Sequence, residues 1–219
     1  MKRKGLFPFF DTAYQGFASG DLDRDAWAIR YFIDQGFQMM VAESFGKNMG
    51  LYGERVGALH VVCSDKPTSE KVKSQIMVLV RQMYLSPPLH GARIAERVLC
   101  NPTNIAAWKE QLKQVASRII QVRIMLRSRL EELNTPGKDE CDLGTWNHIT
   151  DQIGMFSYTG LTEKQCSILI HKYHIHLLST GRISLSGINT KNVEYLAQCI
   201  KASSIRQQND QIRYIDRDR

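Results

Sequence analysis

The sequence predicts an α/β fold in its N-terminal part and a smaller α+β region in its C-terminal part, joined by a long helix. Three observations support this prediction. Between residues 6 and 63, strand, helix, strand, loop and strand patterns follow one another. Residues 104–133 then keep a helical period, with charges on one face and apolar side chains on the other. Beyond residue 150, short apolar runs alternate with helical segments again.

The elements of the first part follow from local patterns. Residues 1–4 resemble the tail of a helix that Gly5 ends, and LFPFF predicts a buried strand. A helix is expected over residues 23–35, because its apolar side chains share a face and Gly36 is a good C-terminal stop. FQMMVA predicts a buried strand and GALHVVC a further strand. The glycine-rich loop SFGKNMGLYGERVG lies between these two strands.

Three helices are expected in the middle of the chain. The first covers residues 69–85 and ends before Pro87 and Pro88, the second begins near His90, and the long helix follows. In the first helix the expected buried residues are Ile76, Leu79, Val80 and Met83. In the long helix they are Leu112, Val115, Ile119, Val122, Met125, Leu126 and Leu130.

The C-terminal part reads as a small α+β region. GMFSYTG and HIHLL predict strands, and residues 162–172 and 190–202 predict helices. KDECDLG lengthens a loop, and residues 203–219 form a polar tail that we expect to be frayed or disordered. The expected domains are therefore residues 1–103 and 104–202. His174 and His176 could share a face of the HIHLL strand, but no third ligand is evident, so we expect no metal site.

Composition and charge exclude several classes of protein. The chain has 219 residues, 43% of them hydrophobic and 23% charged, which suits a globular protein with a sizeable core. The net charge is +7, but Lys and Arg are scattered among Asp and Glu. Nucleic-acid binding needs clustered charge, so we expect no nucleic-acid partner.

Cysteine usage and the apolar runs bear on the compartment. An odd number of cysteines without a CxxC pair favours reduced thiols in the cytoplasm over disulfides or zinc. The N-terminal MKRKGLFPFF is rejected as a targeting segment, because its apolar run is short and contains Pro8. No run approaches the roughly 18 apolar residues of a membrane helix, so we expect no membrane partner. The cysteines are Cys63, Cys100, Cys141, Cys166 and Cys199.

Chemistry points to the loop that follows the second strand. Lys47 lies at the end of this strand, where α/β sheets bind ligands, and its amine could react with a cofactor aldehyde. A lone loop lysine is more often simply solvated. Here Ser44 and Arg55 flank it, and a hydroxyl with a guanidinium suits a phosphate. Upstream, Asp11 could hold a pyridine nitrogen protonated from a buried position, and Tyr14 could donate to a ring oxygen.

Five ordered segments resemble aspartate aminotransferases, which belong to the pyridoxal-phosphate fold type I, class I aminotransferases. They are FFDTAYQGFASGDLDRDAWAIRYF, ESFGKNMGLYGERVG, SPPLHGARI, WNHITDQIGMFSYTGL and LLSTGRISLSGI. The resemblance extends to about Ala202 and is strongest to the animal cytosolic type. It implies that residues 1–103 are part of the large cofactor domain, with a mostly parallel sheet flanked by helices. The remainder would be the small domain.

The resemblance also implies a role for each site residue. Lys47 would be the Schiff-base lysine and proton shuttle, and Asp11 would pair with the pyridine nitrogen. Tyr14 would contact the ring oxygen, and Ser44 and Arg55 would bind the phosphate. The implied cofactor is pyridoxal 5′-phosphate.

Two further arginines match the family's substrate-binding positions. Arg182 would clamp the substrate α-carboxylate. Arg81 would reach across a homodimer interface and select a second carboxylate, which makes aspartate, glutamate and their 2-oxo acids the expected substrates.

The sequence departs from the family in three places. Gly46 stands where the family usually has Ser, and Ser86 stands where it has Asn. The family chain is nearly twice as long, so the N-terminal half is expected to be absent. Two alternatives to an aminotransferase stay open: an amino-acid racemase using the same lysine, or an inactive paralogue or fragment that acts through dimerisation.

Overall fold

The computed structural model describes residues 1–137 and 145–215, with side chains through Ile205. The predicted insertion KDECDLG, with Cys141, lies outside these residues. The chain divides into two compact units, Met1–Val115 and Ala116–Arg219, and each is considered by itself. The division falls inside the long helix.

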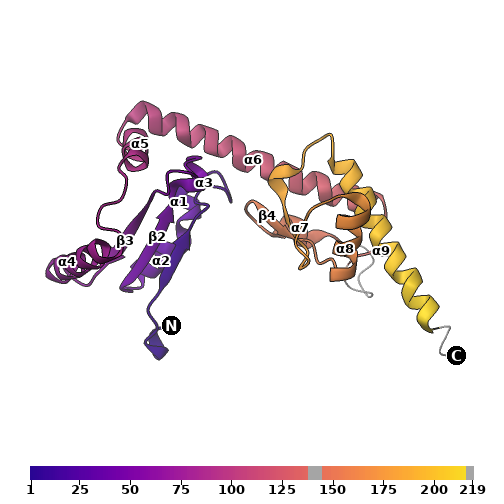
Figure 1. The fold of residues 1–219 in the computed structure, drawn as a ribbon, viewed down its shortest axis with the longest axis horizontal. Helices are drawn as coiled ribbons and strands as arrows, with labels where there is room; N and C mark the ends of the chain where they lie inside the picture. Colours follow the sequence, from indigo (N-terminus) through magenta and orange to yellow (C-terminus); the bar gives the residue numbers. More distant parts are fainter. Residues whose placement is uncertain (138–144, 216–219) are drawn as a thin grey trace. The chain divides into compact units, whose positions relative to one another are not determined.

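The first unit contains a three-stranded sheet in the order β1-β2-β3 (Figure 1), formed by Phe9–Thr12, Met39–Ser44 and Gly57–Val62. The pairing of β1 with β2 is parallel, as predicted, but the pairing of β2 with β3 is antiparallel. The expectation of a mostly parallel sheet is therefore wrong for these strands. The segment between β2 and β3 holds only the four-residue helix α3, Phe45–Asn48, which is too short for a crossover.

One face of this sheet is covered by helices. The predicted helix 23–35 is divided at Ala26 into α1, Leu22–Asp25, and α2, Trp27–Asp34. Phe32 of α2 meets Phe10 of β1 edge to face, with 5.3 Å between ring centroids. On β2, Met39 and Val41 are buried, as expected for this strand. The short 3-10 helix η1, Lys2–Lys4, ends at Gly5 as predicted, but Phe9 of β1 is 66% exposed.

Helix α4, Lys66–Met83, is the main exception to the expected packing. Each of its residues is half-buried or exposed, so the prediction that Ile76, Leu79, Val80 and Met83 are buried is wrong. The period of a helix shows which side chains share a face, but burial depends on what covers that face. Helix α5, His90–Leu99, follows and begins where predicted.

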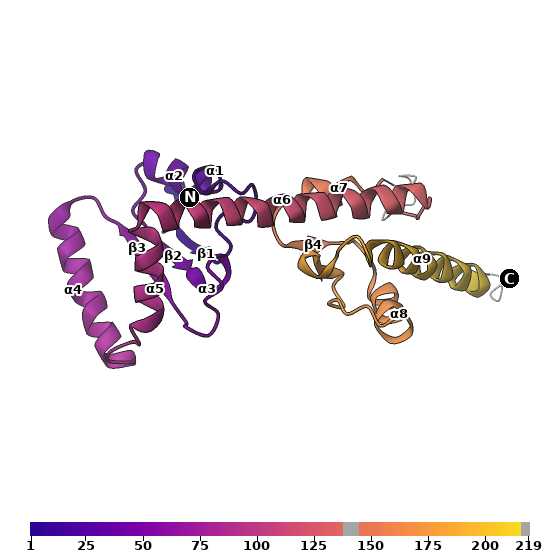
Figure 2. The ribbon, with the colours of Figure 1, turned by 90° about the horizontal axis from the view of Figure 1, so that it is seen from above.

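Helix α6, Pro102–Glu132, is the predicted long helix (Figures 1 and 2). Leu112 is buried in the first unit, whereas Val115 is 40% exposed and Met125 is half-buried. The other residues that were predicted to be buried in this helix are buried in the second unit: Ile119, Val122, Leu126 and Leu130. Of the helices in the described residues, none is long and apolar enough to cross a membrane.

Further α-helices and β-strands follow α6 in the described residues of the second unit. They are α7, Asn147–Asp151; β4, Phe156–Tyr158; α8, Glu163–Tyr173; β5, Arg182–Ser184; and α9, Val193–Ile215. Strands β4 and β5 pair antiparallel, with Tyr158 opposite Arg182. A short 3-10 helix η2, Leu185–Gly187, follows β5. Helix α9 continues through most of the predicted polar tail, so the expectation of a frayed tail is wrong up to Ile215.

The predicted strand HIHLL does not form. Helix α8 ends at His174 in the left-handed conformation, φ 54°, and the next residues form a turn that leads to β5. The strand partner of β4 is instead the segment RIS, and the Thr159 amide donates to the Gly181 carbonyl at 2.9 Å at the end of this pairing. Among the described residues, no three His, Cys, Asp or Glu side chains form a group that could hold a metal ion.

A buried arginine fixes the chain between α7 and β4. Arg123 of α6 is 3% exposed, and its Nη1 donates to the Ile149 carbonyl at 2.6 Å and the Ser157 hydroxyl at 3.3 Å. Its Nη2 donates to the carbonyls of Gly154, at 2.8 Å, and Phe156. Burial lowers the pKa of the Arg123 guanidinium from its usual value. The fork of Arg123 thus joins α7, the segment that follows it and β4.

Candidate active site

The predicted catalytic lysine lies on a tight helical turn at the end of β2. Ser44 caps α3, and its Oγ accepts a hydrogen bond from the Gly46 amide at 3.2 Å. Phe45 is buried and anchors the turn, and Trp108 of α6 donates its indole N–H to the Asn48 carbonyl at 2.8 Å. Lys47 itself is half-buried. The turn that presents Lys47 is thus held before the lysine by buried Phe45 and after it by the hydrogen bond from Trp108 to the Asn48 carbonyl.

Two aromatic rings surround the Lys47 ammonium. Its Nζ lies 5.6 Å from the centroid of Tyr14 and 5.8 Å from that of Tyr52. Both distances are those of cation–π contacts. The Tyr14 ring also packs edge to face against buried Phe17, which holds it in place. Lys47 and Tyr14, predicted from separate segments, therefore meet. Tyr52 was missed, although an aromatic residue in the glycine-rich loop was a visible signal.

Asp11 and Ser44 share one face of the sheet. Asp11 of β1 is paired with Ala42 of β2, and Ser44 lies two residues beyond Ala42, so all three side chains point the same way. Asp11 is exposed, however, and Leu59 on the same face is 49% exposed. The prediction of a buried aspartate is wrong for this chain, because the described residues leave this face of the sheet open.

Arg55 follows Lys47 in the same loop. Its backbone is left-handed, with φ 52°, which is uncommon for a residue with a side chain. Its Nη1 donates to the Tyr52 carbonyl at 3.2 Å, and its side chain is exposed. This contact uses one of the five guanidinium donors and leaves a planar fork of N–H groups of the kind that binds phosphate.

Close approach of two strands makes Gly57 a sensitive position beside this site. Gly57 is paired with Ser44, and a Cβ added to it would lie 2.3 Å from the Glu43 carbonyl oxygen. We expect Gly57→Ala to lower the free energy of unfolding by about 1–3 kcal/mol, because a backbone atom cannot move aside cheaply. Urea denaturation measures this change. Gly53→Ala is the matched control, since a Cβ there meets nothing within 4 Å. Equal effects of the two variants would contradict the steric explanation.

The two predicted substrate arginines are both exposed. Arg81 lies on α4 of the first unit and is not among the residues that surround Lys47. Arg182 begins β5 of the second unit, and its guanidinium lies 4.0 Å from the centroid of the Phe156 ring. It lines a pocket of about 450 Å³ together with His176, Leu178 and Ser184. Stacking on Phe156 leaves the edge of the Arg182 fork available for a carboxylate.

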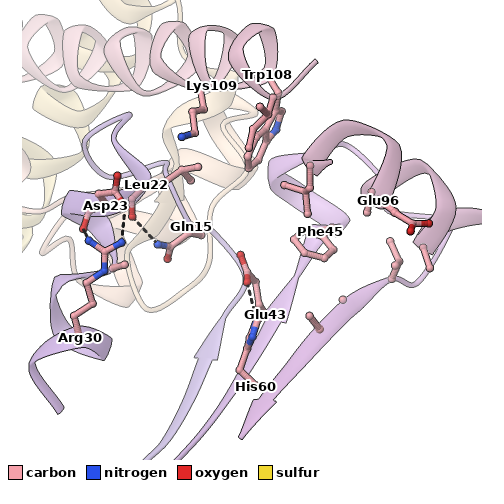
Figure 3. A pocket seen from close by; sticks show the side chains of 18 residues that line it. Gln15, Leu22, Asp23, Arg30, Glu43, Phe45, His60, Glu96, Trp108 and Lys109 are labelled. Carbon is pink, nitrogen blue, oxygen red and sulfur yellow. Dashed lines mark hydrogen bonds and ion pairs between the residues drawn. The ribbon is translucent and has the colours of Figure 1, made fainter. Parts of the chain in front are cut away.

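A second pocket lies on the opposite face of the sheet from Asp11. Figure 3 shows its walls, with Glu43 and His60 facing each other across neighbouring strands at 3.1 Å and Trp108 contributed by α6. Its volume is about 540 Å³. An ion pair between Asp23 and Arg30 closes another side. None of the predicted site residues lines this pocket, and no motif in the sequence indicates it.

Comparisons with known proteins agree with the motifs. A family model described as "Aminotransferase class I and II" matches residues 1–200. The cytoplasmic aspartate aminotransferase of Gallus gallus is 53% identical over 200 residues, which are 91% of this chain and 47% of that protein. The cytoplasmic enzyme of Caenorhabditis elegans is 51% identical over the same shares. The chain thus spans about half the length of the curated relatives it matches.

Solved structures give the same result for the fold. A mitochondrial aspartate aminotransferase from Trypanosoma brucei matches with a TM-score of 0.85 and 43% identity, over 93% of this chain and 51% of that one. An aromatic-amino-acid aminotransferase from Burkholderia pseudomallei, covalently bound to pyridoxal phosphate, matches with a TM-score of 0.85 and 38% identity. This second match covers 93% of this chain and 49% of the Burkholderia chain.

Proposed function

Since this chain belongs to the class I and II aminotransferase family, we propose that its protein transfers amino groups between aspartate or glutamate and 2-oxo acids, using pyridoxal phosphate. The observation that carries the proposal is the Lys47 amine held by two phenol rings at the end of β2. The aspartate aminotransferases to which the chain is similar support the same substrates.

The chemistry of the side chains fits this cofactor. The Lys47 amine is the group that condenses with an aldehyde. The Asp11 carboxylate, on the same sheet face as Ser44 but on the neighbouring strand, can pair with a pyridinium. The Ser44 hydroxyl and the Arg55 guanidinium are phosphate donors. Tyr14 lies next to the lysine and can donate to a ring oxygen. When bound, pyridoxal phosphate supplies an electron-accepting ring next to the substrate α-carbon.

Lys47 is the proposed proton carrier. With its amine neutral, Nζ can take a proton from the substrate α-carbon and return it to a neighbouring carbon, as general base and then acid. The rings of Tyr14 and Tyr52 lie beside Nζ and restrain its position between the two steps. Gly46 makes the turn less constrained than a serine would, and a Cβ there would lie 3.2 Å from Ser44 Oγ.

Substrate selection is assigned to the two arginines. Arg182, stacked on Phe156, would bind the α-carboxylate through its planar fork. Arg81 would bind the second carboxylate of a dicarboxylic substrate in the neighbouring subunit. Both roles follow from the positions that these residues occupy in the family's motifs.

A second copy of the chain is the proposed partner, and α4 is the proposed contact. Four apolar side chains on this helix are between 48% and 76% exposed, in the same stretch as Arg81: Met77, Val78, Leu79 and Met83. Exposed apolar surface of this kind marks interaction sites. A homodimer would bury this surface and bring Arg81 to the partner. We propose a cytoplasmic location, as in the chicken and nematode relatives.

Product analysis separates this proposal from its alternatives. The purified protein, loaded with pyridoxal phosphate, is incubated with L-aspartate and 2-oxoglutarate. We expect glutamate and oxaloacetate in equal amounts. D-Aspartate without glutamate would instead establish a racemase. If cofactor binds and neither product forms, the protein is an inactive relative and the proposed activity is wrong.

A further inference from the structure

Tyr52 contacts both cationic residues of the Lys47 loop through two different groups. Its ring centroid lies 5.8 Å from the Lys47 Nζ, and its carbonyl oxygen accepts from Arg55 Nη1 at 3.2 Å. Tyr14, in contrast, contacts Lys47 from a separate segment. Tyr52 is therefore the loop residue that contacts both the Lys47 amine and the Arg55 guanidinium.

The loop around Tyr52 depends on such contacts for its shape. Glycines stand on both sides of it, with Gly50 at φ 69°, and two backbone hydrogen bonds close the turn: Gly50 to the Lys47 carbonyl and Glu54 to that of Leu51. The left-handed backbone of Arg55 persists only where surrounding contacts hold it. A lysine side chain alone is long, flexible and strongly hydrated. The contacts of Tyr52 restrain both the Lys47 side chain and the Arg55 side chain.

We infer that Tyr52 is a positioning residue that sets the spacing between the Lys47 amine and the Arg55 guanidinium. The inference rests on the proposed function, in which these two groups receive the aldehyde and the phosphate of one cofactor. The ring of Tyr52 restrains the lysine, and its carbonyl restrains the arginine. The carbonyl belongs to the backbone and is kept in every variant, so substitutions at this position test the ring. The phenol hydroxyl plays no part, so phenylalanine can replace tyrosine while leucine cannot.

The first test measures cofactor capture. The chain is titrated with pyridoxal phosphate, whose aldehyde condenses with the Lys47 amine and releases water. Borohydride then adds hydride to the C=N bond, and mass spectrometry gives the labelled fraction at Lys47. We expect Tyr52→Leu to raise the half-saturating concentration about two- to five-fold, the size of an exposed cation–π contact, and Tyr52→Phe to leave it unchanged.

Two further variants sharpen this test. Tyr31→Leu is the matched control, because Tyr31 is 47% exposed against 55% for Tyr52 and its ring contacts Trp27 and Phe32. In an Arg55→Ala background, the effect of Tyr52→Leu should shrink, since the two residues no longer act on one ligand. Strictly additive effects of the two substitutions would contradict the inferred coupling.

The second test needs no cofactor. Trace acetylation with acetic anhydride reports how readily each lysine amine reacts. We expect Lys47 to react about two- to five-fold faster in Tyr52→Leu than in the unmodified chain or in Tyr52→Phe, because the variant lacks one of the two rings that contact Nζ and restrain the amine. Equal rates in all three proteins would overturn the inference. An absence of label at Lys47 in the first test, with a changed acetylation rate, would refute the proposed function instead.

Discussion

Replacing Arg123 with leucine is expected to lower the free energy of unfolding by about 3 kcal/mol or more. The guanidinium donates to three carbonyls and a hydroxyl in a buried position. Leucine fills much of the space but leaves these acceptors without donors, and each buried unsatisfied group costs about 1–3 kcal/mol. Urea denaturation of the purified variants measures the change.

Arg129→Leu is the matched control for Arg123→Leu. Both residues lie on α6, but Arg129 is exposed and forms ion pairs with Glu132 and Glu194 at the surface. Exposed pairs contribute little, so its loss should shift the denaturation midpoint far less. Similar shifts for the two variants would show that the buried fork does not hold the α7–β4 segment in place.

Lys47→Ala is expected to reduce amino transfer by at least about 10⁴-fold, the upper range of a general acid–base contribution. The variant removes both the group that condenses with the cofactor and the proposed proton carrier. The alanine variant should still bind pyridoxal phosphate non-covalently through Ser44 and Arg55. Product formation under the conditions of the aspartate assay measures the loss. Residual activity within tenfold of the unmodified protein would refute the role of Lys47.

Local patterns in the sequence predicted most of the helices and strands. Helix α8 illustrates why: Thr162 caps it and Gln165 completes a capping box, and both signals are read from neighbouring residues. The prediction of a strand at HIHLL is wrong. Its alternation of apolar residues does not reveal that His174 ends a helix in the left-handed conformation. The break at Ala26 was also missed, since the apolar period passes through it without interruption.

The site was predictable in its residue types and less so in its surroundings. Spacing around Lys47 pointed to Ser44 and Arg55, and the structure adds the ring contacts that join Lys47 to Tyr14 and Tyr52. Exposure of Asp11 was not predictable, because burial depends on which segments cover a sheet face. The exposure of the apolar side chains on α4 was not predictable either, because it also depends on which segments cover that helix.

Reductive trapping of pyridoxal phosphate on the chain tests whether Lys47 is the residue that captures the cofactor. The protein is incubated with the cofactor, reduced with borohydride, digested and mapped, with Lys47→Ala treated in parallel. We expect one label per chain, on Lys47, and no comparable label on another lysine of the alanine variant. Label scattered over surface lysines of the folded chain, with no preference for Lys47, would contradict it.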